Sequence, residues 1–302
     1  MEELLKKYVE HLELERSISP LTVRNYTSDI QGFLDFLDNN RVDSLDKVSR
    51  STMRLYLGYL HEQGIARASI SRKLSALRSF YRYLTRENLV DTEPLSTLSS
   101  PKLEKRLPTF LTHEEMARLI EAPDASTPQG LRDRAILELL YAAGLRVSEI
   151  VSLDLNDIDL DSRQIVVWGK GSKERMVLMG RPAAEALRLY LNLSRIKLEG
   201  KAYTQALFLN RFGDRIVVRR IQHIVKKYAR QAVLEMRVFP HIMRHTFATH
   251  LLDGGADLRV VQDLLGHARL SSTQVYTHVS QSQIRRSYLA AHPRSSTQKG
   301  EQ

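Results

Sequence analysis

The segment PHIMRHTFATHLL, residues 240–252, decides how the second half of this chain is expected to fold. Pro240 suits the first position of a helix, where a missing backbone N–H costs nothing and the fixed φ is already helical. His241 and Arg244 are three positions apart, so one rigid helix face presents an imidazole and a guanidinium together. Five apolar residues form the side that we expect to be buried: Ile242, Met243, Phe247, Leu251 and Leu252.

Zinc binding is the alternative interpretation of this segment. His241 and His245 have the i,i+4 spacing of a helical zinc site, but the glutamate of the H-E-x-x-H motif is absent. We therefore expect His245 and His250 to be structural residues with partners inside the protein. The sequence predicts no metal site and no other cofactor.

Downstream, GADLRVVQDLLGHARLSSTQVYTHV, residues 255–279, predicts a second helix over residues 257–265. Gly266 ends that helix, and His267 follows directly. Tyr276 comes nine residues later, after a polar stretch. A tyrosine beside a valine is usually a half-buried core residue, but this one stands in a setting of histidine and arginine.

Upstream, a helix over residues 132–143 is expected to end at Gly144, which places Arg146 in the turn that follows. QIVVW (164–168) and RMVLM (175–179) read as two strands joined by a glycine-containing hairpin loop, GKGSKE. Lys170 and Lys173 both lie in that loop. The predicted fold class is therefore mainly α with a small antiparallel β-sheet.

Six of these side chains suit one chemical task when they are taken together. Two guanidiniums can make forked hydrogen bonds to phosphate oxygens, imidazoles and an ammonium can move protons, and a tyrosine can form a covalent phosphate ester. Each of them alone reads as an ordinary surface or core residue. The candidate catalytic residues are Arg146, Lys170 or its loop neighbour Lys173, His241, Arg244, His267 and Tyr276.

Charge favours a polyanionic partner such as double-stranded DNA. Residues 1–100 carry 14 basic and 14 acidic side chains, whereas residues 101–302 carry 31 and 21, so the whole excess of +10 lies in the later part. Residues 69–84 predict an amphipathic helix whose arginines lie opposite its apolar stripe. Ordinary solubilising charge is the alternative explanation.

The chain reads as two domains. Residues 1–92 predict a helical N-terminal domain, with helices over 2–14 and 20–38. Residues 93–108 read as a linker, because the stretch contains prolines and lacks periodicity. A second domain covers 109–292, opening with Thr112 as helix cap and Glu115 as its capping-box partner. Residues 293–302 are expected to be disordered.

Location and redox chemistry are bounded only loosely. The chain has no cysteine, which excludes disulfides and thiolate metal sites. Its first residues lack the apolar core of a secretory signal, and no stretch reaches membrane-spanning length. We expect a cytoplasmic protein without a membrane partner.

The motifs around the six residues resemble the tyrosine recombinase (phage integrase) family, and its Xer-type site-specific recombinases most closely. The resemblance is carried by AAGLRVSEI, WGKGSKER, PHIMRHTFATHLL and LLGHARLSSTQVYTH, and SISPLTVRNYTSDIQGFLDFL is similar to the family's SAM-like core-binding domain. It covers nearly the whole chain. It implies a two-domain DNA clamp in which the catalytic domain is that of a tyrosine recombinase.

The resemblance also implies a mechanism. Tyr276 would attack DNA to give a 3′-phosphotyrosine, Arg146 and Arg244 would stabilise the phosphate, and Lys170 would protonate the leaving 5′ oxygen. His241 would assist at the nucleophile and His267 would bond the phosphate. Neither ATP nor metal is needed, because the covalent intermediate keeps the energy of the broken bond.

Further implications concern assembly. Four protomers would act as a tetramer on two DNA sites, with a second recombinase or an activating protein as further partners, and the helix over 281–292 would couple neighbours or fold back on its own domain. Resolution of chromosome or plasmid dimers is the implied role. A type IB topoisomerase, a non-catalytic DNA-binding protein of the same fold and a metal-dependent nuclease are the alternatives.

Overall fold

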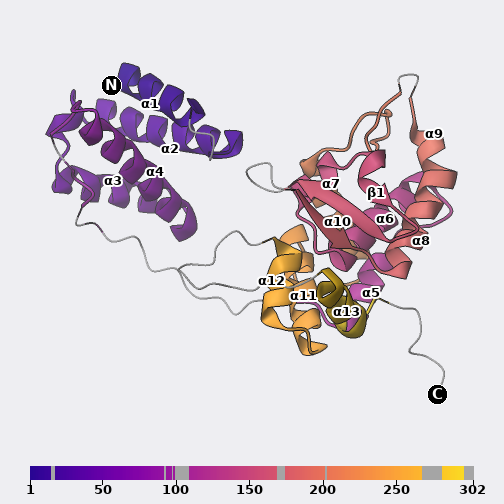
Figure 1. The fold of residues 1–302 in the computed structure, drawn as a ribbon. Coiled ribbons are helices and arrows are strands. Elements are labelled where there is room, and N and C mark those ends of the chain that lie inside the picture. Colours follow the sequence, from indigo (N-terminus) through magenta and orange to yellow (C-terminus); the bar gives the residue numbers. More distant parts are fainter. Residues whose placement is uncertain are drawn as a thin grey trace. The chain divides into compact units, whose positions relative to one another are not determined.

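The computed structural model describes residues 1–14, 18–91, 93–96, 98, 109–168, 174–200, 203–266 and 281–295. The chain divides into two compact units, Met1–Leu107 and Pro108–Gln302, and each has its own hydrophobic core. Helices dominate both units, and the second contains one small antiparallel sheet (Figure 1). The predicted fold class is confirmed.

Four helices form the first unit. Ser19 caps the second of them and Ser49 the third, each by accepting a backbone N–H with its hydroxyl. The stripe that the sequence predicts on the fourth helix, Ile70 to Leu84, is buried along its length. The elements are α1 (Glu2–Leu14), α2 (Pro20–Asn39), the short 3₁₀ helix η1 (Leu45–Lys47), α3 (Arg50–Glu62) and α4 (Arg67–Arg86).

The basic side of α4 is only partly free of acidic partners. Asp29 of α2 is buried and forms ion pairs with Arg72 and with Lys73, the latter at 3.1 Å. Arg67 and Arg82 are exposed. Two of the basic residues of this helix therefore hold α4 against α2, whereas Arg67 and Arg82 are exposed and can reach a partner.

The described part of the predicted linker packs against the first unit. Leu95 is buried in that unit's core, and Arg78 of α4 donates a hydrogen bond to the backbone carbonyl of Leu98. The segment predicted as a linker from residue 93 therefore begins with residues that pack on the first unit, where Leu95 covers an apolar surface.

The second unit is built around α6, which is buried on nearly every side and contacts α5, α7, α8, α10 and α11. A helix that is surrounded in this way forms the centre of a core. The elements of this unit are α5 (His113–Glu121), α6 (Pro128–Ala142), α7 (Val147–Ser152), the 3₁₀ helix η2 (Leu155–Asp157), β1 (Ile158–Asp159), β2 (Gln164–Trp168), β3 (Glu174–Leu178), α8 (Arg181–Leu189), the π-helix η3 (Tyr190–Arg195), α9 (Ile196–Leu198), α10 (Val218–Gln231), α11 (Pro240–Asp253), α12 (Leu258–Leu265) and α13 (Gln281–Ala291).

The sheet has the order β1-β2-β3, and both pairs are antiparallel. Ile165 of β2 lies opposite Val177 of β3, and both are buried, whereas the alternate positions face outward. The predicted pair of strands is confirmed, with β3 beginning and ending one residue earlier than expected, while residues 169–173 of the connecting loop lie outside the described residues. The strand β1 leaves no sign in the sequence, because two residues are too short to show an alternating pattern.

The C-terminal segment folds onto the second unit. Tyr288 of α13 is buried and donates a hydrogen bond of 2.8 Å to the carbonyl of Ala142. His292 and Ser295 are buried as well, and Arg294 pairs with the buried Glu138 at 2.8 Å. The expected disorder from residue 293 is therefore wrong for residues 293–295. Residues 296–302 lie outside the described residues.

Two further findings concern helices. Leu252, expected to be buried, is 40% exposed near the end of α11, whereas the other four apolar residues of that segment are buried. Across the described residues, no helix combines the length and the apolar character that crossing a membrane requires.

Candidate active site

The turn between α6 and α7 places Arg146. Gly144 has φ +56°, a left-handed conformation that glycine adopts without strain, and a β-carbon at this position would lie 2.5 Å from the ring of Phe247. Two residues later Arg146 is the cap residue of α7. Its side chain is 42% exposed, so the guanidinium can reach a ligand.

Helix α11 places Arg244 beside that turn. Arg244 donates one hydrogen bond to the carbonyl of Gly144 and another to the carbonyl of Leu265, the last residue of α12. Its side chain is only 13% exposed. One guanidinium therefore joins the end of α6, the middle of α11 and the end of α12.

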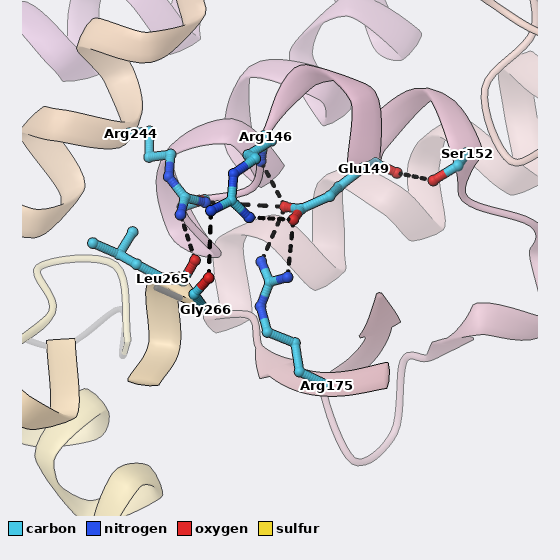
Figure 2. Close-up of polar contacts among 8 residues, drawn as sticks. Arg146, Glu149, Ser152, Arg175, Arg244, Leu265 and Gly266 are labelled. Carbon is cyan, nitrogen blue, oxygen red and sulfur yellow. Dashed lines mark hydrogen bonds and ion pairs between the residues drawn. The ribbon is translucent and has the colours of Figure 1, made fainter. Parts of the chain in front are cut away.

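Glu149 of α7 lies at the centre of the arginines, as Figure 2 shows. One of its oxygens accepts a hydrogen bond of 2.8 Å from Arg146 Nη1, and the other accepts one of 2.8 Å from the Arg146 backbone N–H. Arg244 Nη1 lies 4.0 Å from the second oxygen. The carboxylate is 4% exposed and thus holds both candidate arginines from inside the protein.

Arg175 of β3 binds the same carboxylate from the sheet. Its Nη1 and Nη2 donate to the two oxygens of Glu149 at 2.9 and 3.0 Å, which is a forked arrangement. The side chain is 16% exposed. Three guanidiniums thus share one carboxylate, and these four side chains together carry an excess of two positive charges.

Electrostatics keep the cluster ionised. Burial by itself would raise the pKa of Glu149, but hydrogen bonds from Arg175 and Arg146 outweigh it, so the pKa lies below its ordinary value. Burial, together with the charge of Arg146, lowers the pKa of Arg244 to about 10. Both groups are charged at neutral pH, and the arginine pair forms a site for an anion.

Gly266 connects this cluster to the segment that carries the candidate nucleophile. It ends α12 with φ +63°, and its carbonyl accepts a hydrogen bond of 3.4 Å from Arg146 Nη2. A β-carbon at this position would lie 2.9 Å from Arg175 Nε. The chain therefore leaves α12 directly against two arginines, and the next residue in sequence is His267.

The structure brings together some of the six candidate residues. Arg146 and Arg244 meet on Glu149, while His241 lies one helical turn before Arg244 on α11. The His241 ring is exposed and stacks on Phe239, with centroids 5.6 Å apart. Lys170, His267 and Tyr276 lie outside the described residues.

Sequence reasoning missed Glu149 and Arg175, although both stand inside the quoted motifs. The only local signal for Glu149 was its position three residues after Arg146, where a capping glutamate is expected. That signal is weak because arginine is not a usual cap residue. Nothing local identifies the partner of Arg175, which lies 26 residues from Glu149 in sequence.

We expected His245 and His250 to be structural residues with partners inside the protein, and the structure shows such a partner for His250. His250 is buried, and its Nδ1 shares a hydrogen bond of 2.7 Å with the Tyr141 hydroxyl. Within the described ranges, no group of three or more histidine, cysteine, aspartate or glutamate side chains could hold a metal ion.

Two family descriptions match this chain. The phage integrase family matches residues 109–283, and the N-terminal SAM-like domain of phage integrases matches residues 5–88. The first match includes all six candidate residues, and it also includes Glu149 and Arg175.

Individual proteins are similar over nearly the full length. Tyrosine recombinase XerC of Bacillus pumilus (strain SAFR-032) is 47% identical over 294 residues, which cover 96% of each chain. Tyrosine recombinase XerC of Pelotomaculum thermopropionicum is 46% identical and covers 96% of this chain and 98% of its own. A solved structure of the XerH site-specific recombinase, bound to a palindromic difH substrate after cleavage, matches in fold with a TM-score of 0.71 at 23% identity, over 94% of this chain and 80% of that one.

Proposed function

The chain belongs to the phage integrase family, and from that premise we propose that Arg146, Lys170, His241, Arg244, His267 and Tyr276 form its active site. It is a Xer-type tyrosine recombinase, an enzyme of site-specific DNA recombination that acts through a tyrosine-linked intermediate, as in dimer resolution. Each of the six residues has a separate role in that reaction.

The observation that best supports this active-site assignment is that Arg146 and Arg244 both lie against Glu149. Both guanidiniums are fixed by protein hydrogen bonds before DNA arrives, and Arg146 stays accessible. A scissile phosphate placed there would meet two prearranged cations as charge builds on its non-bridging oxygens. Each well-placed donor of this kind is typically worth about 3 kcal/mol of transition-state stabilisation.

The covalent step then involves the residues on either side of this pair. The Tyr276 oxygen attacks phosphorus, its proton passes toward His241, and the bond from phosphorus to the 5′ oxygen breaks. Lys170 supplies a proton to that oxygen, and His267 donates to the phosphate. The product is a 3′-phosphotyrosine and a free 5′ hydroxyl, and the reverse attack by a 5′ hydroxyl rejoins the strand.

Binding and assembly extend the proposal. Double-stranded DNA is the substrate, bound both by the domain predicted over residues 1–92 and by the catalytic domain predicted over residues 109–292. Two sites are paired by four protomers, either of this chain alone or of this chain and a second recombinase. An activating protein and a cytoplasmic location belong to the same proposal, which rests on the Xer-type relatives and on the chain's basic excess of +10.

A suicide DNA substrate tests the proposal. A nick close to the scissile phosphate lets the short 5′ fragment diffuse away, so the covalent adduct accumulates and can be followed on a denaturing gel. We expect the adduct to form in EDTA with the unchanged chain, and to disappear in Tyr276→Phe.

Each other outcome points elsewhere. An adduct that persists in Tyr276→Phe moves the nucleophile to another residue. Strand cutting that stops in EDTA favours a metal-dependent nuclease, whereas specific binding without any cutting favours a non-catalytic DNA-binding protein. Relaxation of supercoiled DNA with a single site, without strand exchange, favours a type IB topoisomerase.

A further inference from the structure

We infer that Arg175 is a positioning residue of the recombination reaction, which acts by locking Glu149 so that Arg146 and Arg244 are held in place for the phosphate. The inference rests on the proposed function, because it takes these two arginines as the phosphate-binding pair. It adds a residue of strand β3 to the cluster that Arg146, Glu149 and Arg244 form.

Arg175 has the geometry of a lock rather than of a ligand-binding group. Its two terminal nitrogens, Nη1 and Nη2, donate hydrogen bonds to the two oxygens of Glu149, at 2.9 and 3.0 Å. The remaining nitrogen, Nε, is buried and has no hydrogen-bond partner among the described residues. The Nη1–Nη2 edge faces Glu149 and Nε is buried, so neither forked edge of this guanidinium is open to a phosphate.

Glu149 needs such a lock to orient its other partners. The carboxylate is 4% exposed, and each of its oxygens accepts bonds from both Arg146 and Arg175. Without Arg175, only the Arg146 backbone N–H would fix the carboxylate, because the other bond comes from the Arg146 side chain that the carboxylate has to orient. A second fork from a different element fixes the plane of the carboxylate, and with it the Arg146 guanidinium.

The lock also reaches the end of α12. A β-carbon on Gly266 would lie 2.9 Å from Arg175 Nε, so the arginine side chain lies directly against that backbone. The Gly266 carbonyl accepts from Arg146, and the neighbouring Leu265 carbonyl accepts from Arg244. Arg175 thus touches the carboxylate and the backbone to which both phosphate-binding arginines are attached.

The primary test compares Arg175→Ala with Arg181→Ala in the full-length chain. Arg181 pairs with Glu185 on the surface, so its loss removes one positive charge from the same unit without touching Glu149. At saturating enzyme on a suicide substrate, we expect Arg175→Ala to slow adduct formation about 100-fold, the scale of a 1 Å misplacement of reacting groups. Arg181→Ala should cleave like the unchanged chain.

Two modified substrates separate positioning of the arginines from other roles. A methylphosphonate at the scissile position has one negative charge fewer than a phosphate. If Arg175→Ala cleaves slowly because the phosphate charge is poorly neutralised, its rate defect should be smaller on this substrate. The rate defect of Arg244→Ala should become smaller in the same way. A 5′-bridging sulfur leaves without needing a proton donor, so it should relieve Lys170→Ala but leave the Arg175→Ala defect unchanged.

The outcomes are distinguishable. Failure of the unchanged chain to form an adduct overturns the proposed function itself. If the unchanged chain cleaves and Arg175→Ala cleaves equally fast, the positioning role is wrong. Rescue of Arg175→Ala by the bridging sulfur would mean that it acts on the leaving-group proton instead. If the Arg175→Ala rate defect is equal on all three substrates and its melting temperature is lowered, Arg175 has a purely structural role. If Arg175 is a positioning residue, Arg175→Lys should restore part of the cleavage rate.

Discussion

At the residue scale, Glu149 is the side chain on which the arginine cluster depends. Removing a carboxylate from between three guanidiniums leaves buried positive charge without its partner, and such losses are strongly destabilising. Glutamine keeps the size and one acceptor oxygen but removes the charge. Glu149→Gln therefore isolates the electrostatic part of the interaction.

We expect Glu149→Gln to lower the free energy of unfolding by about 2 kcal/mol at pH 7. Because the folded-state pKa of Glu149 is depressed, its stabilisation is fully present above the unfolded value of 4.5 and is lost as pH falls through the folded pKa. The difference between the two chains should thus shrink below pH 4.5. Urea unfolding at pH 7, 5 and 3, followed by the fluorescence of the single tryptophan, Trp168, measures it in the second unit. A difference that is constant with pH would contradict the assignment.

The residue scale also shows what the sequence can and cannot reveal about this site. The positions of Arg146 and Arg244 follow from local rules: a glycine turn after one helix, and a proline at the start of another. Their meeting point does not, because Glu149 joins them to Arg175, which lies 26 residues further along the chain, and to Arg244 of the distant helix α11. Tertiary pairing of this kind leaves no periodic trace in a single sequence.

At the element scale, the C-terminal segment is attached by aromatic packing around His292. Its ring stacks on Tyr288 with centroids 5.0 Å apart and contacts Tyr141 and Phe247, and its Nδ1 accepts from the Arg294 backbone N–H at 3.1 Å. Burial, and then the neighbouring His250, lower its pKa to about 3. The segment therefore holds a neutral imidazole where a charged one is excluded.

Because His292 is buried in its neutral form, we predict that the C-terminal segment is held less strongly by the second unit in acid. Between pH 6.5 and about 3 the unfolded chain binds a proton at this position that the folded chain excludes, so stability falls as pH falls. From pH 6.5 to 5 the loss is about 2 kcal/mol, at 1.36 kcal/mol for each pH unit.

His292→Phe keeps a ring in the stack and removes the titration, so its stability should depend less on pH over that range. The exposed His223 of α10 changed to Phe is the matched control for the loss of one imidazole. Thermal unfolding at pH 7 and pH 5, followed by Trp168 fluorescence, gives both slopes. If His292→Phe and the unchanged chain lose equal stability, the histidine is not the source of the acid sensitivity.

Elements differ in how well the sequence predicts them. Long helices with caps, such as α2 and α5, follow from periodicity and from Ser19 and Thr112. The strand β1 and the packed residues 293–295 do not, because each is short and depends on a distant surface for its structure. The prediction of disorder is wrong for residues 293–295, because Arg294 donates to Glu138 and Ser295 donates to the carbonyl of Leu289.

At the scale of the whole molecule, charge is arranged differently in the two units. The first 100 residues are neutral in sum, yet Arg67 and Arg82 of α4 are exposed, while Arg72 and Lys73 are paired with Asp29. A neutral unit with a locally basic helix can still bind a polyanion. We therefore expect DNA binding by the first unit to depend on where its basic side chains lie rather than on its total charge.

The double variant Arg67→Gln, Arg82→Gln tests that arrangement against Lys47→Gln. Lys47 lies in the same unit and is paired with Asp43 on the surface, so it controls for lost charge away from α4. Each phosphate contact contributes about 0.9 to the slope of log K against log salt concentration. We expect the double variant to lower that slope by about 2, and Lys47→Gln to leave it unchanged.

Fluorescence anisotropy of labelled duplex DNA between 50 and 200 mM salt measures both slopes. Once the DNA is saturated, adduct formation by the double variant should match that of the unchanged chain, because the arginine cluster on Glu149 lies in the other unit. Equal slopes for the two variants would mean that α4 faces solvent in the complex. DNA binding by the first unit would then have to come from residues outside α4.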